Sequence, residues 1–147
     1  MCGRVIFISS DLSDELFPDN ELKSKISELL ELCKKSAEFD GWVRKTGMKG
    51  YCKELKKETD EVINALESND IDNLKEELGD VFMDLFEICI LAEEESVFSF
   101  IDVLESAVMK IKRRRPYILE NKKVSDKESV DYWYKAKDLE KLKKRKK

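Results

Sequence analysis

The sequence predicts an all-α protein built as a bundle of amphipathic helices. Apolar residues recur three and four positions apart along several long segments, which is the spacing of one helix face. Charged residues make up 41% of the 147 positions, and there are only five Gly and two Pro. This balance favours helices with short connections over a β-sandwich. The length suits one helical domain at 20–140, after an irregular arm at 1–19 and before a basic, solvated tail at 141–147.

The first three predicted helices follow the arm. The first covers about 20–38, and the Asp40-Gly41 pair breaks it. The second covers about 49–67 and the third about 71–95, with a short polar turn between them. The third helix is apolar around most of its middle, so several helices or a second subunit must cover it.

The fourth predicted helix begins after Ser99, which forms an N-terminal capping pair with Asp102, and Pro116 stops it. We expect one of its faces to be buried, consisting of Ile101, Val103, Leu104, Val108 and Ile111. Residues 117–125 form a linker, and a last helix begins near Asp126. Acidic residues concentrate before Glu105, and basic residues gather from Lys110 onward.

Two acidic pairs lie on neighbouring predicted helices, Glu58-x-x-Glu61 on the second and Glu77-x-x-Asp80 on the third. The spacing puts both carboxylates of each pair on one helix face. If the two helices pair antiparallel, the four carboxylates meet at one place. Mg²⁺ prefers several anionic oxygens and would relieve their repulsion, and Mn²⁺ can substitute for it.

The alternative explanation is a charged, solvent-facing helix side, because a chain with 32 acidic residues produces such pairs by chance. Three features favour a metal site. The acids are interleaved with apolar residues. Gly79 costs roughly 1 kcal/mol against Ala within a helix, which suggests the close approach of a chain segment or ligand. Asp84 lies one turn beyond Asp80, where it can be a further ligand or support one.

The residues around these pairs resemble the ExxE…ExxD signature of the MazG-like nucleotide pyrophosphohydrolases. Four more elements occur in the order of that family: Trp42 of its PWD element, the segment 90–99 (its IAEEEGxFS), the segment 110–117 (its KLIRRHPHV) and Trp133-x-x-x-Lys137 (its WExxK). The resemblance covers about 42–137. It implies an oligomeric bundle of the all-α NTP pyrophosphatase type, a homodimer or tetramer. It also implies Mg²⁺-dependent hydrolysis of (d)NTPs to (d)NMP and pyrophosphate.

The resemblance implies roles for particular residues. It gives Glu58, Glu61, Glu77 and Asp80 as metal ligands, Lys110 and Arg114 as main phosphate ligands with Arg113 second, Trp133 and Lys137 as further nucleotide contacts, and Trp42 as the base-stacking candidate. Arg suits phosphate because its planar fork binds two oxygens at once. Taken alone, the basic run is also explained by the negative end of the helix dipole, and Trp133 by packing in the core.

Two other functions are considered. Met1-Cys2-Gly3-Arg4 is how some N-terminal-nucleophile proteins begin, with Cys2 as the attacking group. Their folds are β-rich, which argues against this function. The other is a non-catalytic helical protein whose acidic face binds a partner. Four Cys without a CxxC pair, in a chain without His, argue against structural zinc.

Charge and hydropathy limit the partners. The net charge of −4 argues against nucleic acid as a partner, although the tail could serve as a nuclear-localisation or nucleic-acid patch instead of a solubilising one. No signal-peptide core and no apolar run of transmembrane length occurs. We therefore expect a cytoplasmic protein without a membrane partner, which binds a nucleoside triphosphate.

Overall fold

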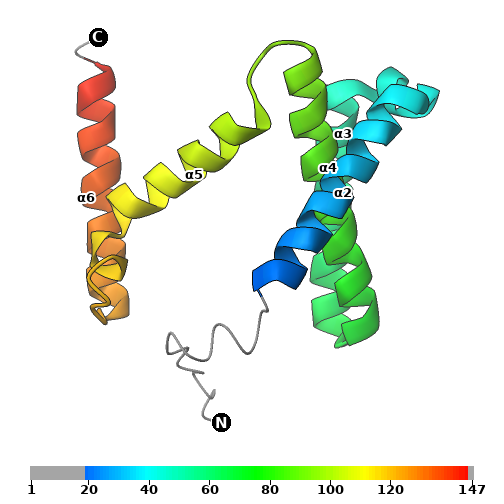
Figure 1. The fold of residues 1–147 in the computed structure, drawn as a ribbon. Helices are drawn as coiled ribbons and strands as arrows, with labels where there is room; N and C mark the ends of the chain where they lie inside the picture. Colours follow the sequence, from blue (N-terminus) through cyan, green and yellow to red (C-terminus); the bar gives the residue numbers. More distant parts are fainter. Residues whose placement is uncertain (1–18, 146–147) are drawn as a thin grey trace. The chain divides into compact units, whose positions relative to one another are not determined.

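The computed structural model describes residues 19–145, and the regular structure in this range is entirely helical. The elements are α2 (Asp19–Phe39), α3 (Gly41–Ser68), α4 (Ile71–Glu94), α5 (Phe100–Arg114), the 3₁₀-helix η1 (Pro116–Ile118) and α6 (Asp126–Lys144) (Figure 1). The prediction of an all-α fold is confirmed for this range. Cys2 and all but the last residue of the arm at 1–19 lie outside it. None of the helices within it has the length and apolar character needed to cross a bilayer.

The chain divides into two compact units, residues 1–97 and residues 98–147. The described part of the first unit contains α2, α3 and α4, and that of the second contains α5, η1 and α6. The domain boundaries expected from the sequence, 20–140 with a tail at 141–147, remain predictions.

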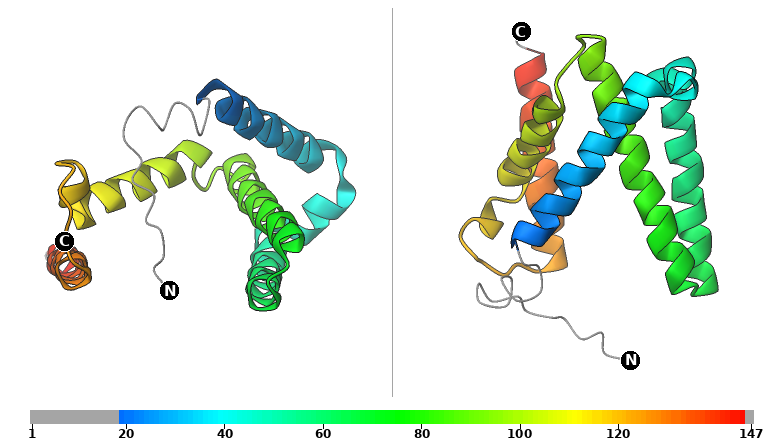
Figure 2. Two further views of the ribbon diagram at one scale, coloured as in Figure 1. Left: turned by 90° about the horizontal axis from the view of Figure 1, so that it is seen from below. Right: turned by 45° about the vertical axis from the view of Figure 1, so that its right-hand side comes forward.

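In the first unit, α3 and α4 form an antiparallel hairpin, and Figure 2 shows them side by side. Asn69 makes the turn with a left-handed backbone (φ 56°), and its N–H bonds to the carbonyls of Ala65 and Leu66. Asp70 then caps α4 by accepting a hydrogen bond from the Asn73 N–H at 3.1 Å. A connection of two residues forces the helices to pack side by side, so residues equally far from the turn face each other.

Helix α3 begins earlier than the sequence predicted and contains a break. Asp40 caps its first turn by accepting a hydrogen bond from the Trp42 N–H at 2.7 Å. Gly47 then interrupts the helix with φ 60° and ψ 175°, a conformation that is essentially restricted to glycine. The prediction of 49–67 therefore describes only the part of α3 after the break.

The core of the first unit lies where α2 meets α3 and α4. Its buried residues are Cys33, Ala37, Val43, Tyr51, Ile90 and Leu91. Cys89 is also buried, as expected for a small apolar side chain in this run. In contrast, Leu78, Phe82 and Leu85 on α4 are exposed. The space beside Gly79 is open, so the expectation that a chain segment packs closely against it is wrong for the described residues.

In the second unit, two capping boxes fix the helix starts. Ser99 and Asp102 cap α5, as predicted, and Ser125 and Glu128 cap α6. Buried Tyr117 of η1 joins its hydroxyl to that of Ser129 on α6, with 2.8 Å between the oxygens. The last helix continues through Lys144 and so reaches into the predicted tail.

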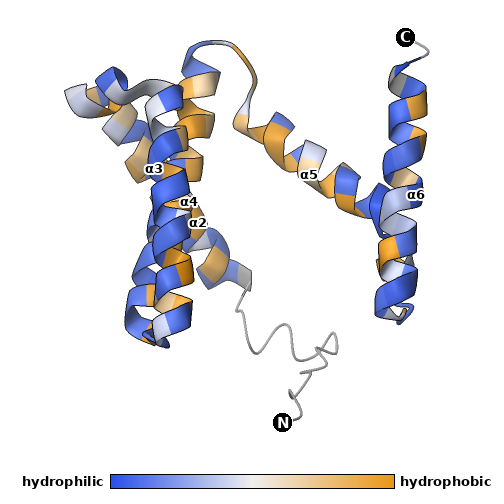
Figure 3. Ribbon diagram, turned by 180° about the vertical axis from the view of Figure 1, so that it is seen from behind, coloured by the Kyte–Doolittle hydropathy of each residue, from blue (hydrophilic) through white to orange (hydrophobic). Residues whose placement is uncertain are grey.

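The predicted buried face of α5 is exposed in the single chain, so this prediction is wrong for the described residues. Its members, Ile101, Val103, Leu104, Val108 and Ile111, are all exposed, and no residue of α5 is buried. Figure 3 shows hydrophobic residues recurring along this helix. The hydrogen bonds from α5 to α6 come from Arg113 and Arg114 at its end. The apolar face therefore has no partner within the described part of its unit.

We expect Gly47→Ala to lower the free energy of unfolding by about 1–3 kcal/mol, because a side chain strains this backbone conformation. Gly41→Ala is the matched control, because Gly41 lies in the first turn of the same helix and has open space around it. It should be neutral or slightly stabilising. Denaturant unfolding of both variants measures the difference, and equal midpoints would contradict the assignment of Gly47 as a required glycine.

Candidate functional site

The α3–α4 hairpin brings three of the predicted metal ligands together. Glu58 of α3 and Glu77 and Asp80 of α4 each place one carboxylate oxygen within 4.8 Å of the others. The hairpin explains this arrangement, because Glu58 and Asp80 are almost equally far from the turn. The side chain of Glu58 is largely buried, so the group is partly shielded from water.

Glu61, the fourth predicted ligand, lies next to this group and is joined to it through Lys57. The Lys57 Nζ lies 3.1 Å from an oxygen of Glu58 and 3.1 Å from an oxygen of Glu61. Its hydrogen bond lowers the pKa of Glu61. Burial, followed by the charge of Glu61, raises the pKa of Glu77. The ammonium of Lys57 thus neutralises part of the charge on Glu58 and Glu61. The negative charge of Glu77 remains unfavourable, because Glu77 is partly desolvated and lies near Glu61.

Two further carboxylates continue the acidic stripe along α4. Asp84 is 4% exposed and Glu87 is 3% exposed, and the Asp84 Oδ2 and Glu87 Oε2 atoms have no hydrogen-bond partner. Burial, and then the charges of Glu58, Glu54 and Asp80, raise the pKa of Asp84 to about 6. The charges of Glu58 and Asp80 act on Asp84, so Asp84 lies near two of the predicted ligands.

Glu87 was not predicted as a site residue. It lies three residues after Asp84 in an otherwise apolar run, so extending the stripe of acids by one turn would have found it. Burial raises the pKa of Glu87, while a hydrogen bond from Ser36 acts in the opposite direction.

The donor set fits a hard divalent cation. Its ligating atoms are all carboxylate oxygens, which Mg²⁺ and Mn²⁺ prefer. The unpartnered buried oxygen of Asp84 shows in addition that the protein leaves negative charge uncompensated here. The residues present can therefore hold a metal ion.

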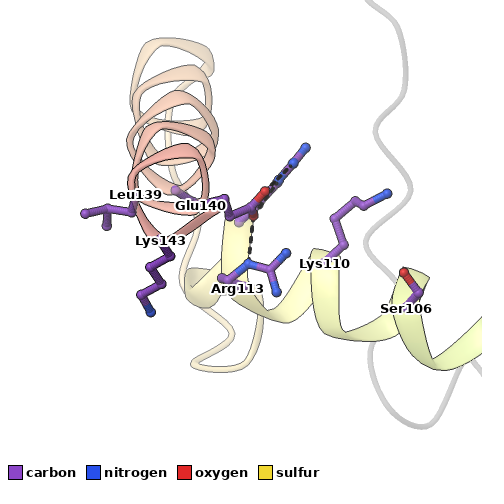
Figure 4. A pocket seen from close by; sticks show the side chains of 8 residues that line it. Ser106, Lys110, Arg113, Leu139, Glu140 and Lys143 are labelled. Atoms are coloured by element: carbon purple, nitrogen blue, oxygen red, sulfur yellow. Dashed lines mark hydrogen bonds and ion pairs between the residues drawn. The ribbon is translucent and has the colours of Figure 1, made fainter. Parts of the chain in front are cut away.

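The predicted phosphate ligands line a pocket of about 710 Å³ between α5 and α6 (Figure 4). Its lining residues are Ser106, Lys110, Arg113, Arg114, Ala136, Leu139, Glu140 and Lys143. The structure thus brings Lys110, Arg113 and Arg114 together at one pocket, and their role as phosphate ligands stays a prediction. It adds Glu140 and Lys143, which the sequence analysis missed because their contacts depend on how the two helices pair.

The three further predicted nucleotide contacts, Trp133, Lys137 and Trp42, lie in different surroundings. The guanidinium of Arg114 lies 4.6 Å from the ring centre of Trp133, and that of Arg115 lies 5.3 Å away. Lys137 lies near the ring of Tyr134, at 5.9 Å, and does not line the pocket. Trp42, in the first unit, is exposed and meets Tyr51 edge to face, with 5.8 Å between the ring centres.

The buried carboxylate of Asp84 predicts a pH dependence of stability. Its pKa of about 6 in the folded protein is above its ordinary value of 3.8, so folding favours the protonated form. In a metal-free buffer this residue should therefore stabilise the protein increasingly as the pH falls from about 7 to below 4. Asp84→Asn should raise the free energy of unfolding at pH 7, on the order of 1–3 kcal/mol.

Paired melting curves of the parent and Asp84→Asn, recorded with a chelator across this pH range, measure the effect. The variant should show the smaller pH dependence, because Asn does not titrate. The charge of Asp84 also raises the pKa of the neighbouring Glu87, so the difference between the two curves measures Asp84 together with this coupling. Parallel curves would show that Asp84 is not the destabilising group.

Three comparisons relate the chain to known proteins. Residues 47–119 match the family model of the MazG nucleotide pyrophosphohydrolase domain. The nucleoside triphosphate pyrophosphohydrolase of Mycobacterium tuberculosis is 26% identical over 129 residues, which cover 86% of this chain and 40% of that protein. The one of Mycolicibacterium smegmatis is 35% identical over 89 residues, covering 59% of this chain and 28% of that protein. The chain thus spans less than half the length of these relatives.

A solved structure supports the same relationship. The crystal structure of a MazG-related protein from Thermotoga maritima superposes with a TM-score of 0.71 at 28% sequence identity. The match covers 76% of this chain and 98% of that one. Sequence, domain model and fold agree, and residues 47–119 are identified as a MazG nucleotide pyrophosphohydrolase domain.

Proposed function

We propose that this chain is a Mg²⁺-dependent nucleoside triphosphate pyrophosphohydrolase, which hydrolyses a (d)NTP to the (d)NMP and pyrophosphate. The observation that carries the proposal is the group of carboxylates from Glu58, Glu77 and Asp80 on two paired helices. The identified domain supports it, because relatives of this chain are named nucleoside triphosphate pyrophosphohydrolases and MazG-family enzymes generally depend on a divalent metal.

The proposed metal ligands are Glu58, Glu61, Glu77 and Asp80, with Asp84 as a supporting group. When bound, Mg²⁺ supplies charge neutralisation at the phosphate oxygens and lowers the pKa of a bound water. The carboxylates of the hairpin would hold the metal, and one that remains free would accept the proton of the attacking water. Lys57 holds Glu58 and Glu61 in place at 3.1 Å from each, so these two carboxylates are kept near one another before a substrate arrives.

Lys110 and Arg114 are the proposed main ligands of the phosphate chain, and Arg113 is the next. Their side chains line one pocket, and guanidinium groups stabilise negative charge that develops on a leaving pyrophosphate. Trp133 holds the Arg114 guanidinium against its ring, which limits the positions that this side chain can take. Direct contacts of Trp133, Lys137 and Trp42 with the nucleotide remain predictions.

We expect Asp80→Asn and Glu61→Gln each to keep the fold and to lose roughly 10²-fold or more of the metal-dependent turnover, because each removes an anionic oxygen while keeping the shape. Asp72→Asn is the matched control, since Asp72 lies on α4 but its side chain is 94% exposed and pairs with Lys75. Pyrophosphate release from a panel of canonical and modified triphosphates, with circular dichroism for the fold, measures the effect. A folded Asp80→Asn protein with near-parental rates would refute the proposed site.

We propose further that the chain functions as a homo-oligomer, at least a dimer. The supporting observation is the exposed apolar face of α5 together with exposed Phe82 on α4, since apolar faces of this extent are generally covered. Leu104→Glu should weaken assembly, because it places a charge in the middle of the α5 face. Sedimentation should show the oligomer for the parent, and its melting temperature should rise with concentration. A parent that sediments as a stable monomer at low micromolar concentration would contradict this expectation.

A further inference from the structure

A carboxylate of the chain itself, that of Glu140, lines the cationic pocket in the second unit and pairs with two of its cations. The Glu140 Oε1 atom accepts hydrogen bonds from Arg113 Nε at 2.7 Å and Arg114 Nε at 3.1 Å, and its Oε2 atom accepts one from Arg114 Nη2 at 2.8 Å (Figure 4). The pair is partly buried, with 21% of the Glu140 side chain and 13% of the Arg114 side chain exposed. This paired geometry is the one with which Arg binds phosphate oxygens.

Glu140 neutralises only part of the charge in the pocket. Four cationic side chains line it, Lys110, Arg113, Arg114 and Lys143, against this one carboxylate. Lys110 and Lys143 have no ion-pair partner in the part of the chain that the structure describes. The hydrogen bonds from Arg114 and Arg113 lower the pKa of Glu140 to about 2, so the carboxylate is ionised at neutral pH and competes with any incoming anion.

We propose that Glu140 acts as an internal competitor for anions in this pocket and makes the pocket selective for polyphosphates over a single phosphate group. Glu140 is attached to the pocket, so it competes at a high effective concentration. A single phosphate that replaces it exchanges one anion for another at the same guanidinium groups. A polyphosphate carries more charge and more oxygens, so Lys110 and Lys143 can hold it while Glu140 stays on the guanidinium groups. Only the single phosphate then loses affinity to the competition, which is why Glu140 changes the preference.

The consequence for the reaction rests on the proposed function. A pocket with this selectivity would bind the polyphosphate chain of a substrate and retain a nucleoside monophosphate only weakly. The alternative role for Glu140 is to position the two guanidinium groups for every anion. The two roles predict opposite signs, because removing a competitor tightens the binding of a single phosphate, whereas removing a positioning group weakens the binding of all anions.

The experiment is isothermal titration of the full chain with sodium phosphate, pyrophosphate and tripolyphosphate at constant ionic strength, in the presence of a chelator. The proteins are the parent, Glu140→Gln and the control Asp138→Asn, which removes an exposed carboxylate of the same helix that does not line the pocket. In Glu140→Gln, phosphate should bind more tightly and the preference for pyrophosphate over phosphate should fall about tenfold. Asp138→Asn should keep the preference of the parent.

An unchanged preference in Glu140→Gln, or weaker binding of both anions, would overturn the inference. If melting curves show that Glu140→Gln is unfolded, Glu140→Asp replaces it, because the shorter carboxylate cannot keep all three hydrogen bonds; it should lower the preference by a smaller factor. These titrations require no turnover. A parent that binds polyphosphates selectively but releases no pyrophosphate from any triphosphate would refute the proposed function only. An active parent whose preference is unaffected by Glu140→Gln would refute this inference only.

Discussion

Repulsion among the carboxylates between α3 and α4 is the constraint that the rest of the first unit accommodates. The short turn at Asn69-Asp70 holds the two helices side by side and so brings Glu58 against Glu77 and Asp80. Nothing in the hydrophobic core requires acids at these positions, and burial of Asp84 adds to the cost. A fold selected for stability alone would place apolar residues here, and the proposed metal ion would relieve the repulsion.

Local sequence signals predicted most of the helices, because helix starts and stops depend on neighbouring residues. Ser99 with Asp102 marked the start of α5 correctly, and the spacing of the acidic pairs predicted which residues of α3 and α4 meet. The sequence around Gly47 does not show that this residue has a positive φ inside a helix that continues on both sides. Glu140 could not be found in this way, because its partners Arg113 and Arg114 lie on another helix and the pairing depends on tertiary packing.

The exposed face of α5 shows a different limit of sequence reasoning. Its apolar spacing correctly indicates a helix with one face that avoids water. The pattern carries no information about which surface covers that face, and the assumption that the same chain covers it was wrong for the described residues. The amphipathic pattern thus predicted the helix and its apolar face. It did not predict which surface packs against that face.

Lys57 gives the hairpin a cation of its own. Its ammonium contacts Glu58 and Glu61, so the acidic cluster is partly neutralised before any metal binds. A metal ion that bound Glu58 and Glu61 would have to displace the Lys57 ammonium from these two carboxylates. Under the proposed function, the affinity for metal would thus be set in part by a side chain that is not itself a ligand.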